Sequence, residues 1–193
     1  MLSEKDILRM LTSLGVLMEG HFLLTSGRHS GKYLQCAKIF EDSAKAEILC
    51  RELAGKFKND HVTVVIGPAM GAVTMAYEVS RHLGCRNFFT ERENGIMTLR
   101  RGFTLSPDDN VLLVEDVVTT GGSIKEVYEM VRASGANVAG IGAVVDRSLG
   151  RHGFKVRFES VIAIEVESWE KDSCPLCAGG AEAPYKPGSG GAK

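Results

Sequence analysis

The sequence predicts an α/β fold in which a central, mainly parallel sheet has helices on both faces and a small N-terminal hood precedes it. Two observations support this fold class. From residue 62 onward, short β-branched segments alternate with segments of helical periodicity, and strands separated by helices usually pair in parallel through right-handed crossovers. Residues 111–114 are all apolar, which is typical of a strand buried on both faces.

Residues 1–40 form the predicted hood. Ser3 can cap a first helix, along which apolar residues recur at helical spacing as far as Leu14. Residues 20–35, GHFLLTSGRHSGKYLQ, interleave turn-forming and aromatic residues, so they predict a short hairpin or a binding segment. His21 and His29 flank the turn of this segment, and we interpret them as ordinary polar contacts.

Residues 41–170 form the predicted core. Its elements, in order, are a helix at 43–58, a strand at 62–66, a helix at 72–83, strands at 86–90 and 111–115, a helix at 123–133, and strands at 138–145 and 161–164. In such sheets, ligands bind where the carboxyl ends of the strands meet, so the polar residues that follow each strand are the candidate site.

The long connection at residues 91–110 and the C-terminal tail, residues 171–193, do not fit this alternation. Connections of twenty residues inside a compact domain are usually lids or binding loops. Cys174 and Cys177 form one CPLC pair, which we interpret as a turn, because a closed zinc site needs four ligands. A zinc site shared across a dimer and a redox role are the alternatives. From residue 178 the tail is rich in Gly, Pro and Ala, so we expect it to be disordered or held only by partners.

Composition excludes several classes of protein. The net charge of −1 gives no basic surplus for nucleic acid, and no apolar run reaches the length of a membrane-spanning helix. The N-terminus lacks the apolar core of a signal peptide. We therefore expect a cytoplasmic protein with no nucleic-acid or membrane partner, in which Cys36, Cys50 and Cys85 are reduced thiols.

The most informative segment is residues 111–123, VLLVEDVVTTGGS. Glu115 and Asp116 stand where the predicted strand leaves the core, and a helix is predicted from Ser123. In the turn between them, glycines let backbone N–H groups approach an anion, hydroxyls add donors, and the helix directs its positive end to the same place. A phosphate site beside two carboxylates suits a ribose 5-phosphate. An ordinary strand–turn–helix connection is the alternative.

Two further strand ends carry candidate binding residues. The turn at residues 67–71, GPAMG, follows a strand and opens a helix. Tight packing alone can explain it, but beside the first turn it predicts a diphosphate site, and the two sites together would describe phosphoribosyl diphosphate. At the end of the strand at 138–145, Arg147 of the Asp146-Arg147 pair can bind a planar anion with two hydrogen bonds, whereas a surface ion pair is the alternative. No HExxH, GxSxG or Cys–His pattern supports hydrolase chemistry.

These motifs resemble those of the orotate phosphoribosyltransferases, a family of type I phosphoribosyltransferases, over nearly the whole chain. Residues 22–30, FLLTSGRHS, are similar to the family's F-x-L-x-S-G-x-x-S segment, residues 115–123 to its phosphoribosyl diphosphate loop, and residues 146–147 to its D-R pair. The resemblance implies the type I phosphoribosyltransferase fold. It also implies transfer of ribose 5-phosphate from phosphoribosyl diphosphate to orotate, which gives orotidine 5′-phosphate and diphosphate.

The resemblance implies roles for particular residues. Glu115 and Asp116 would hold the ribose hydroxyls and act in catalysis. The residues expected to bind phosphoribosyl diphosphate are Glu115, Asp116, Val117, Val118, Thr119, Thr120, Gly121, Gly122, Ser123, Ala69, Met70 and Gly71. The residues expected to bind orotate are Thr119, Arg147, Ser26 and Gly27. The family uses Mg²⁺ that is chelated mainly by the substrate, so no residue is expected to act as a dedicated metal ligand.

The chain departs from the family's pattern in two places. Thr25 stands where the family usually has lysine, and the segment 91–110 contains no lysine, although the family's lid is rich in it. We expect arginines of the lid to take the catalytic part of that lysine, and the candidates are Arg92, Arg100 and Arg101. A solvated charged loop is the alternative. The resemblance also implies a homodimer in which each lid serves the partner's site.

Two other functions fit the same motifs. A purine-base phosphoribosyltransferase would share the phosphate sites, but the SGRHS segment and Arg147 favour an anionic pyrimidine. A non-catalytic regulator that senses phosphoribosyl diphosphate would need a DNA-binding segment, and residues 1–61, which precede the first core strand, contain no evident helix-turn-helix.

Overall fold

The computed structural model describes residues 2–24 and 26–187, and a six-stranded sheet forms its centre. The strands, in spatial order, are β5 (Ile96–Leu99), β4 (Arg86–Glu93), β3 (Val64–Pro68), β6 (Asn110–Val118), β7 (Asn137–Asp146) and β8 (Phe158–Ala163). All neighbouring strands pair in parallel except β4 and β5, which are antiparallel. The predicted fold class is confirmed.

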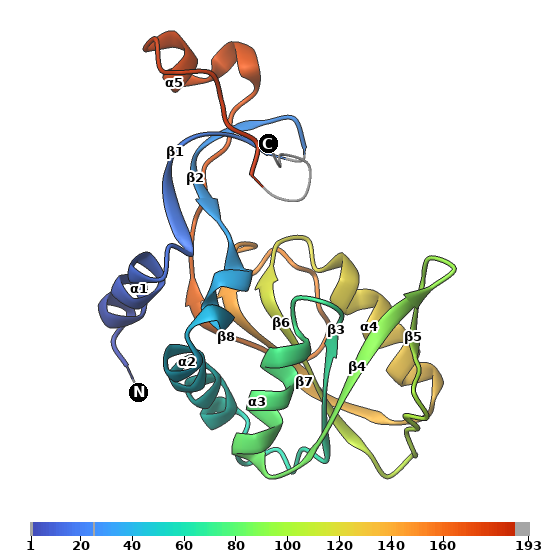
Figure 1. Cartoon of the computed structure of the whole chain (residues 1–193). Helices are drawn as coiled ribbons and strands as arrows, with labels where there is room; N and C mark the ends of the chain where they lie inside the picture. The colour runs from blue at the N-terminus through green and yellow to red at the C-terminus, as the bar shows by residue number, and fades with distance from the viewer. Residues whose placement is uncertain (1, 25, 188–193) are drawn as a thin grey trace.

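Helices cover both faces of this sheet (Figure 1). α2 (Ser43–Lys56) and α3 (Val73–Leu83) pack on one face, and α4 (Gly122–Ala133) packs on the other. Successive side chains of a strand point to opposite faces of the sheet, so each strand contributes to the hydrophobic cores on both faces. Val65 belongs to the hydrophobic cluster beneath α2 and α3, whereas Val64 and Ile66 belong to the cluster beneath α4. β3 is therefore apolar and buried along its whole length, as the run of β-branched residues predicts.

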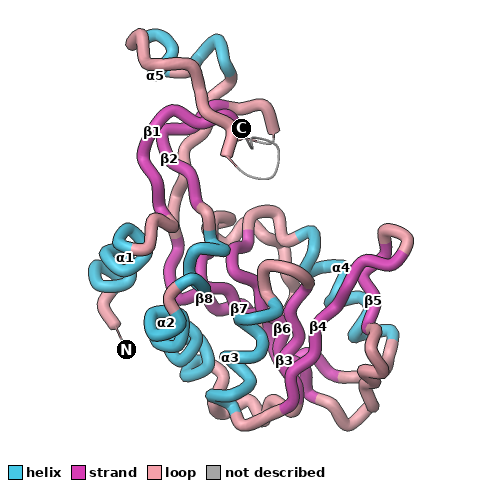
Figure 2. The backbone as a smooth tube through the Cα atoms, viewed as in Figure 1, coloured by secondary structure: helices cyan, strands magenta, loops and turns pink. Residues whose placement is uncertain are grey.

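The hood projects from the main body as a hairpin beside a helix (Figure 2). Its elements are α1 (Glu4–Ser13), β1 (Leu17–Leu23), β2 (His29–Leu34) and a 3₁₀ helix, η1 (Cys36–Glu41), and β1 pairs with β2 antiparallel. The hydroxyl of Ser3 accepts a hydrogen bond from the backbone N–H of Asp6, which confirms the expected cap. The chain then passes from the hairpin into the core through η1.

The C-terminal segment lies against this hairpin. It contains η2 (Lys171–Ser173) and the short helix α5 (Pro175–Ala178). Tyr185 donates its N–H to the carbonyl of His21 and accepts at its own carbonyl from the N–H of Leu23, both at 2.8 Å. The expectation that the tail from residue 178 is disordered or held only by partners is therefore wrong as far as residue 187, because its own chain binds it. Residues 188–193 lie outside the described part.

Three predicted elements need correction. Residues 91–110 do not form a single open loop: β4 continues to Glu93 and turns back as β5, because its backbone finds an antiparallel partner. β6 runs on to Val118, so Glu115 and Asp116 lie within the strand and not beyond it. β8 begins at Phe158, earlier than predicted.

The boundaries at residues 40 and 170 between hood, core and tail stay a prediction. Among the described helices, none is long and apolar enough to cross a bilayer.

Candidate active site

The candidate site lies at the carboxyl edge of the sheet, where β3, β6 and β7 end side by side. β6 pairs in parallel with β3 on one side and with β7 on the other, so the polar residues after each strand share one edge. Gly71, in the turn after β3, approaches the carboxylate of β6 closely: a Cβ atom added to Gly71 would lie 3.2 Å from Oδ2 of Asp116. The structure therefore brings the turn at 69–71 against the acidic pair, as the sequence predicts.

The pKa values of the two carboxyl groups of β6 are both raised above their ordinary values. Burial, and then the negative charge of Asp116, raise the pKa of Glu115 from 4.5 to about 8. Burial also raises the pKa of Asp116, although its Oδ1 accepts a hydrogen bond from the N–H of Val117 at 2.7 Å. At neutral pH the Glu115 carboxyl is thus mostly protonated. The protonated carboxyl can donate a hydrogen bond, and a cation that binds beside it must displace its proton.

The turn between β6 and α4 is built to receive an anion. Gly121 has φ of +74°, a conformation that glycine adopts without strain, and α4 begins at the next residue. A pocket of about 160 Å³ is lined by Glu115, by Val117 and Val118, and by all residues from Thr119 to Ile124. Backbone N–H groups at the N-terminus of a twelve-residue helix make this pocket suitable for phosphate.

Arg147 stands at the neighbouring strand end, held by a turn that Asp146 organises. The buried carboxylate of Asp146 accepts from the N–H and hydroxyl of Ser148 at 2.7 and 2.6 Å and from the N–H of Gly150 at 3.2 Å. Arg147 itself lines a pocket of about 420 Å³ together with Thr119 and Thr120. Its Nε is buried without a hydrogen-bond partner, and burial lowers the pKa of its guanidinium. The guanidinium of Arg147 is thus available to bind an anionic group in this pocket.

Tyr33 and Cys36, at the base of the hood, lie near Arg147 and were not predicted as site residues. Both raise the pKa of the Arg147 guanidinium by their charge interaction with it. Tyr33 comes from β2, and Cys36 begins η1. The only sequence signal was the interleaving of aromatic and polar residues at 20–35, because the approach of the hood to β7 depends on the tertiary fold.

Ser26 and Gly27 occupy the far end of the hairpin. The turn is closed by hydrogen bonds from the N–H of Gly27 to the carbonyl of Leu24 and from the N–H of Leu24 to the carbonyl of Arg28. Neither Ser26 nor Gly27 lines the two pockets around Thr119. The structure thus does not bring them together with Arg147 within the chain. Thr25, the departure from the family's lysine, lies outside the described residues.

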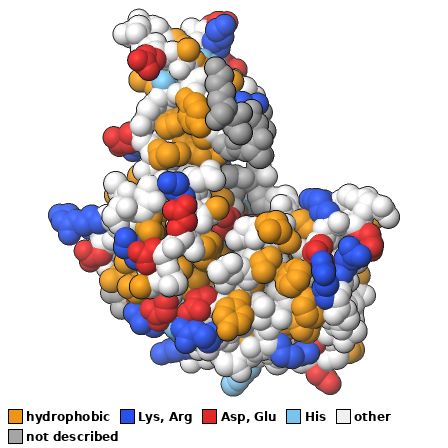
Figure 3. Space-filling model, in the orientation of Figure 1, with side chains coloured by type: hydrophobic (Ala, Val, Ile, Leu, Met, Phe, Trp, Pro, Cys, Tyr) orange, Lys and Arg blue, Asp and Glu red, His pale blue; other side chains and the backbone are white. Residues whose placement is uncertain are grey.

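Arg92 lies in β4, Arg100 and Arg101 directly follow β5, and all three are paired with carboxylates. Arg92 binds Glu126 of α4 through two hydrogen bonds of 2.9 and 2.8 Å, and Arg101 binds Glu91 at 2.9 Å. Arg100 lies 3.5 Å from Glu93. Figure 3 shows charged side chains of both signs gathered at this side of the molecule. None of the three arginines lines the described pockets around Thr119, so within one chain the lid stays apart from the carboxylates.

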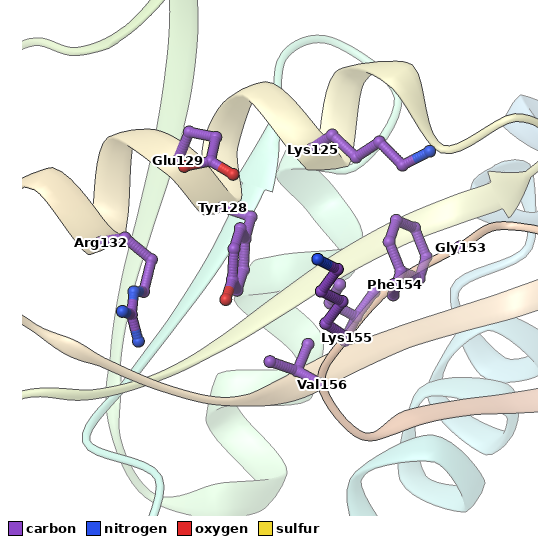
Figure 4. A pocket seen from close by; sticks show the side chains of 9 residues that line it. Lys125, Tyr128, Glu129, Arg132, Gly153, Phe154, Lys155 and Val156 are labelled. Carbon is purple, nitrogen blue, oxygen red and sulfur yellow. The ribbon is translucent and has the colours of Figure 1, made fainter.

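A separate pocket of about 390 Å³ lies between α4 and residues 153–156 (Figure 4). Lys125, Tyr128 and Arg132 face it from the helix, and Phe154 faces them from the loop. The pocket contains no paired carboxylates. Its contribution to the candidate site is through Phe154, whose ring lies within 2.5 Å of the position that a Cβ atom on Gly121 would take. The loop at residues 153–156 therefore packs against the turn at residues 119–122, the candidate phosphate site.

Comparisons with known proteins agree with this geometry. The family described as Phosphoribosyl transferase domain matches residues 37–170. The orotate phosphoribosyltransferase of Thermoanaerobacter sp. (strain X514) is 52% identical over 97% of this chain and 98% of its own length. That of Thermotoga maritima is 49% identical over 97% of this chain and 100% of its own. Among solved structures, the orotate phosphoribosyltransferase of Aeropyrum pernix is 27% identical, with a TM-score of 0.67 over 81% of this chain and 92% of that one.

Proposed function

The chain belongs to the orotate phosphoribosyltransferases, and we propose that the carboxyl edge of its sheet transfers ribose 5-phosphate from phosphoribosyl diphosphate to orotate. This reaction is a step of pyrimidine biosynthesis. The observation that carries the proposal is the meeting of three features at one edge: the paired carboxylates of β6, the anion pocket of residues 119–124, and the buried, unpartnered Nε of Arg147.

Each part of the substrates has a counterpart at this edge. We assign the 5-phosphate to the turn Thr120–Ser123, the ribose hydroxyls to Glu115 and Asp116, and the diphosphate to Ala69–Gly71. Arg147 and Thr119 would bind orotate, and the charge of the Arg147 guanidinium suits its carboxylate. Ser26 and Gly27 would take part only if the hood moves or if a partner chain supplies them.

Ribosyl transfer passes through a state in which positive charge develops on the ribose. The enzyme's task is therefore to stabilise that charge and the departing diphosphate, and no covalent intermediate with the protein is needed. Asp116 would favour the positive ribose by its negative charge. Glu115, mostly protonated at neutral pH, would donate a hydrogen bond to a ribose hydroxyl until a bound cation ionises it.

The carboxylate pair also fits Mg²⁺. Mg²⁺ usually binds through one or two carboxylates together with substrate phosphates, and Glu115 and Asp116 stand beside the turn at 69–71 to which we assign the diphosphate. When bound, Mg²⁺ would neutralise negative charge on the leaving diphosphate. Because the pKa of Glu115 is raised, its carboxyl would release a proton when the cation binds, so cation binding would strengthen as pH rises toward about 8.

We propose that the lid acts across a two-fold homodimer. Arg92 in β4 and Arg100 and Arg101 just after β5 form ion pairs in which every arginine is exposed, so these pairs are easily exchanged for an incoming diphosphate. Arginine stays charged at neutral pH, so these residues would stabilise the leaving group by charge and not by donating a proton. A closed lid would also keep water from the activated ribose. The enzyme would work in the cytoplasm, where its unpaired cysteines stay reduced.

A panel of bases tests the substrate. Orotate, uracil, adenine, hypoxanthine and xanthine are each supplied with phosphoribosyl diphosphate and Mg²⁺, and release of diphosphate is measured. We expect turnover of orotate, and none in the absence of Mg²⁺. Uracil is the matched control, because it lacks only the carboxylate. Turnover of a purine with none of orotate would contradict the proposal, and binding of phosphoribosyl diphosphate without any turnover would favour a regulator.

A variant tests how Arg147 selects the base. Arg147 lines the pocket around Thr119 together with two other basic residues, Lys125 and Arg151. Replacing Arg147 with alanine removes the cation to which we assign the orotate carboxylate, so we expect the preference for orotate over uracil to fall about tenfold to a hundredfold, the range of a charged hydrogen bond. Arg132→Ala, on the exposed side of α4, is the control and should leave the preference unchanged. An unchanged preference in Arg147→Ala would move the orotate site elsewhere while leaving the reaction itself in place.

A further inference from the structure

Two histidines of the hood hairpin and two cysteines of the C-terminal segment meet in one cluster. His21 comes from β1, His29 from β2, and Cys174 and Cys177 from the start of α5. One ligand atom from each of the four lies within 4.8 Å of all the others. The interpretation of the cysteine pair as a plain turn is therefore incomplete, because the two ligands that a closed metal site still needed lie about 150 residues earlier in the chain.

The distances within the cluster are close to those of a tetrahedral site, with the two nitrogens about 0.3 Å nearer each other than in a loaded one. Nε2 of His21 lies 3.0 Å from Nδ1 of His29 and 3.6 Å from Sγ of Cys174. Sγ of Cys177 lies 3.7 Å from the same Nε2 and 3.3 Å from Nδ1 of His29. Zn–N bonds of about 2.0 Å and Zn–S bonds of about 2.3 Å place the ligand atoms of a tetrahedral site roughly 3.3–3.8 Å apart. We propose that His21, His29, Cys174 and Cys177 bind one structural Zn²⁺ ion.

The surroundings of His21 prepare it as a ligand. Its Nδ1 lies 2.8 Å from the backbone carbonyl of Glu182. A carbonyl only accepts, so Nδ1 carries the proton and Nε2 presents its lone pair toward the other three ligand atoms. Metal-binding histidines almost always have their second nitrogen held by a carbonyl or carboxylate in this way. Here the carbonyl comes from the same C-terminal segment that supplies the cysteines.

Charge and burial favour a closed site. Zn²⁺ binds thiolates, so Cys174 and Cys177 would release their two protons to solvent, and two thiolates with two neutral imidazoles leave a site of zero net charge. Cys174 and His29 are buried, with 2% and 4% of their surface exposed, whereas Cys177 is exposed and leaves a path for the ion. Four protein ligands leave no open position, so the ion would have a structural role and not a catalytic one.

The hairpin and the C-terminal segment need such a link. Among the described residues, neither of the two hydrophobic clusters includes a member from 167–187. The segment is held by backbone pairs, between His29 and Trp169 and between His21 and Tyr185, and by hydrogen bonds that Arg28 donates to Ser168. Figure 1 shows α5 beyond the hairpin, far from the sheet. Structures too small to build a hydrophobic core are commonly stabilised by a metal or by disulfides. One Zn²⁺ would join the three chain segments.

A second cluster of potential metal ligands is less suited to a metal ion than the first. Glu47, Glu78 and His82 also bring three ligand atoms together. Both carboxylates are already paired with arginines of their own helices, Glu47 with Arg51 at 3.0 Å and Glu78 with Arg81 at 2.6 Å. A cation would have to displace these arginines. Sulfur ligands and a fourth donor are present only in the first of the two clusters found among the described residues.

Metal content tests the proposal directly. The full-length protein is purified without chelator, and zinc is measured by inductively coupled plasma mass spectrometry. We expect about one zinc per chain in the wild type, loss of most of it in Cys177→Ser, and full retention in Cys85→Ser, a matched control because Cys85 lies outside the cluster. Cys177 is exposed, so its replacement by serine should leave the fold of the core intact.

Limited proteolysis measures the structural role of the ion. Trypsin should cut at Lys171 faster in Cys177→Ser than in the Cys85→Ser control, because the C-terminal segment is released.

Two further measurements keep the test decisive. If the purified protein holds no zinc, the reduced apoprotein is titrated with Co²⁺, and tetrahedral thiolate coordination should give visible absorption that is lost in Cys177→Ser and in His21→Ala. The proposal is wrong if neither zinc nor Co²⁺ binds to the reduced protein. It is also wrong if Cys177→Ser and His21→Ala both keep a full equivalent of zinc, or if native mass spectrometry of protein purified without reductant shows a Cys174–Cys177 disulfide in place of the ion.

Discussion

Glu115→Gln should make the protein more stable at alkaline pH. The folded protein keeps the Glu115 carboxyl protonated up to a pKa of about 8, whereas the ordinary value is 4.5. Between these two values the unfolded chain has lost a proton that the folded chain retains. The free energy of unfolding therefore falls as pH rises from about 4.5 to about 8, and it is unaffected by this group outside that window. Glutamine resembles the protonated carboxyl and does not titrate, so the free energy of unfolding of the variant does not fall over this pH range.

The magnitude follows from the size of the pKa shift. A shift from 4.5 to about 8 corresponds to about 4–5 kcal/mol at pH 8.5. Glu115 is only partly buried at the surface of its pocket, and solvent that reaches it will relax part of this cost. We therefore expect Glu115→Gln to gain about 2–4 kcal/mol over the wild type at pH 8.5, and less than about 1 kcal/mol at pH 5.0.

Urea unfolding followed by far-ultraviolet circular dichroism, at one protein concentration and at both pH values, measures the two differences. Glu129→Gln, on the exposed side of α4, shows what the loss of one surface carboxyl does by itself. A gain of the same size at pH 5.0 and pH 8.5 would show that the substitution acts through packing. A variant that is no more stable than the wild type at pH 8.5 would show that Glu115 is ionised in the folded protein, and the reasoning would be refuted.

Further outcomes are expected for the carboxylate pair, the phosphate turn, the dimer and the lid. Asp116→Asn should lower kcat about tenfold to a thousandfold, equivalent to about 1.4–4 kcal/mol, and an unchanged kcat in steady-state assays would leave the carboxylate a positioning role only. Gly121→Ala strains a backbone with φ of +74° and meets a neighbouring ring, so calorimetry should show weaker binding of phosphoribosyl diphosphate, whereas unaltered affinity would move the phosphate elsewhere. Analytical ultracentrifugation should find a dimer, and a fully active monomer would contradict a lid supplied by the partner. Alanine at Arg92, Arg100 or Arg101 should slow transfer more than it weakens orotate binding. Mixing such a chain with Asp116→Asn should restore part of the activity, and heterodimers that restore none would show that the lid does not act in trans.

The local signals along the chain were sufficient for the parallel strands of the sheet and for the residues around their carboxyl ends. Apolar runs such as 111–114 need burial on both faces, and helices between strands impose parallel pairing. Once the strands are parallel, their carboxyl ends must meet, so Glu115, Asp116 and Arg147 come to one edge without any further information. The short turn at 119–122 is likewise a local property, because glycine and the following helix define it.

Tertiary structure decided what depends on segments that are distant in sequence. Pairing of residues 96–99 with the end of β4 turned an expected loop into a hairpin, and the approach of the hood brought Tyr33 and Cys36 to Arg147. The pKa of Glu115 could not be read from the sequence, because it depends on how much solvent the neighbouring strands exclude. His21 and His29 are too far from the CPLC pair in the sequence to form a recognisable metal-binding motif with it. Only the return of the C-terminal segment along the hairpin places their nitrogens beside the two sulfur atoms, because contacts between distant segments are set by packing and not by local periodicity.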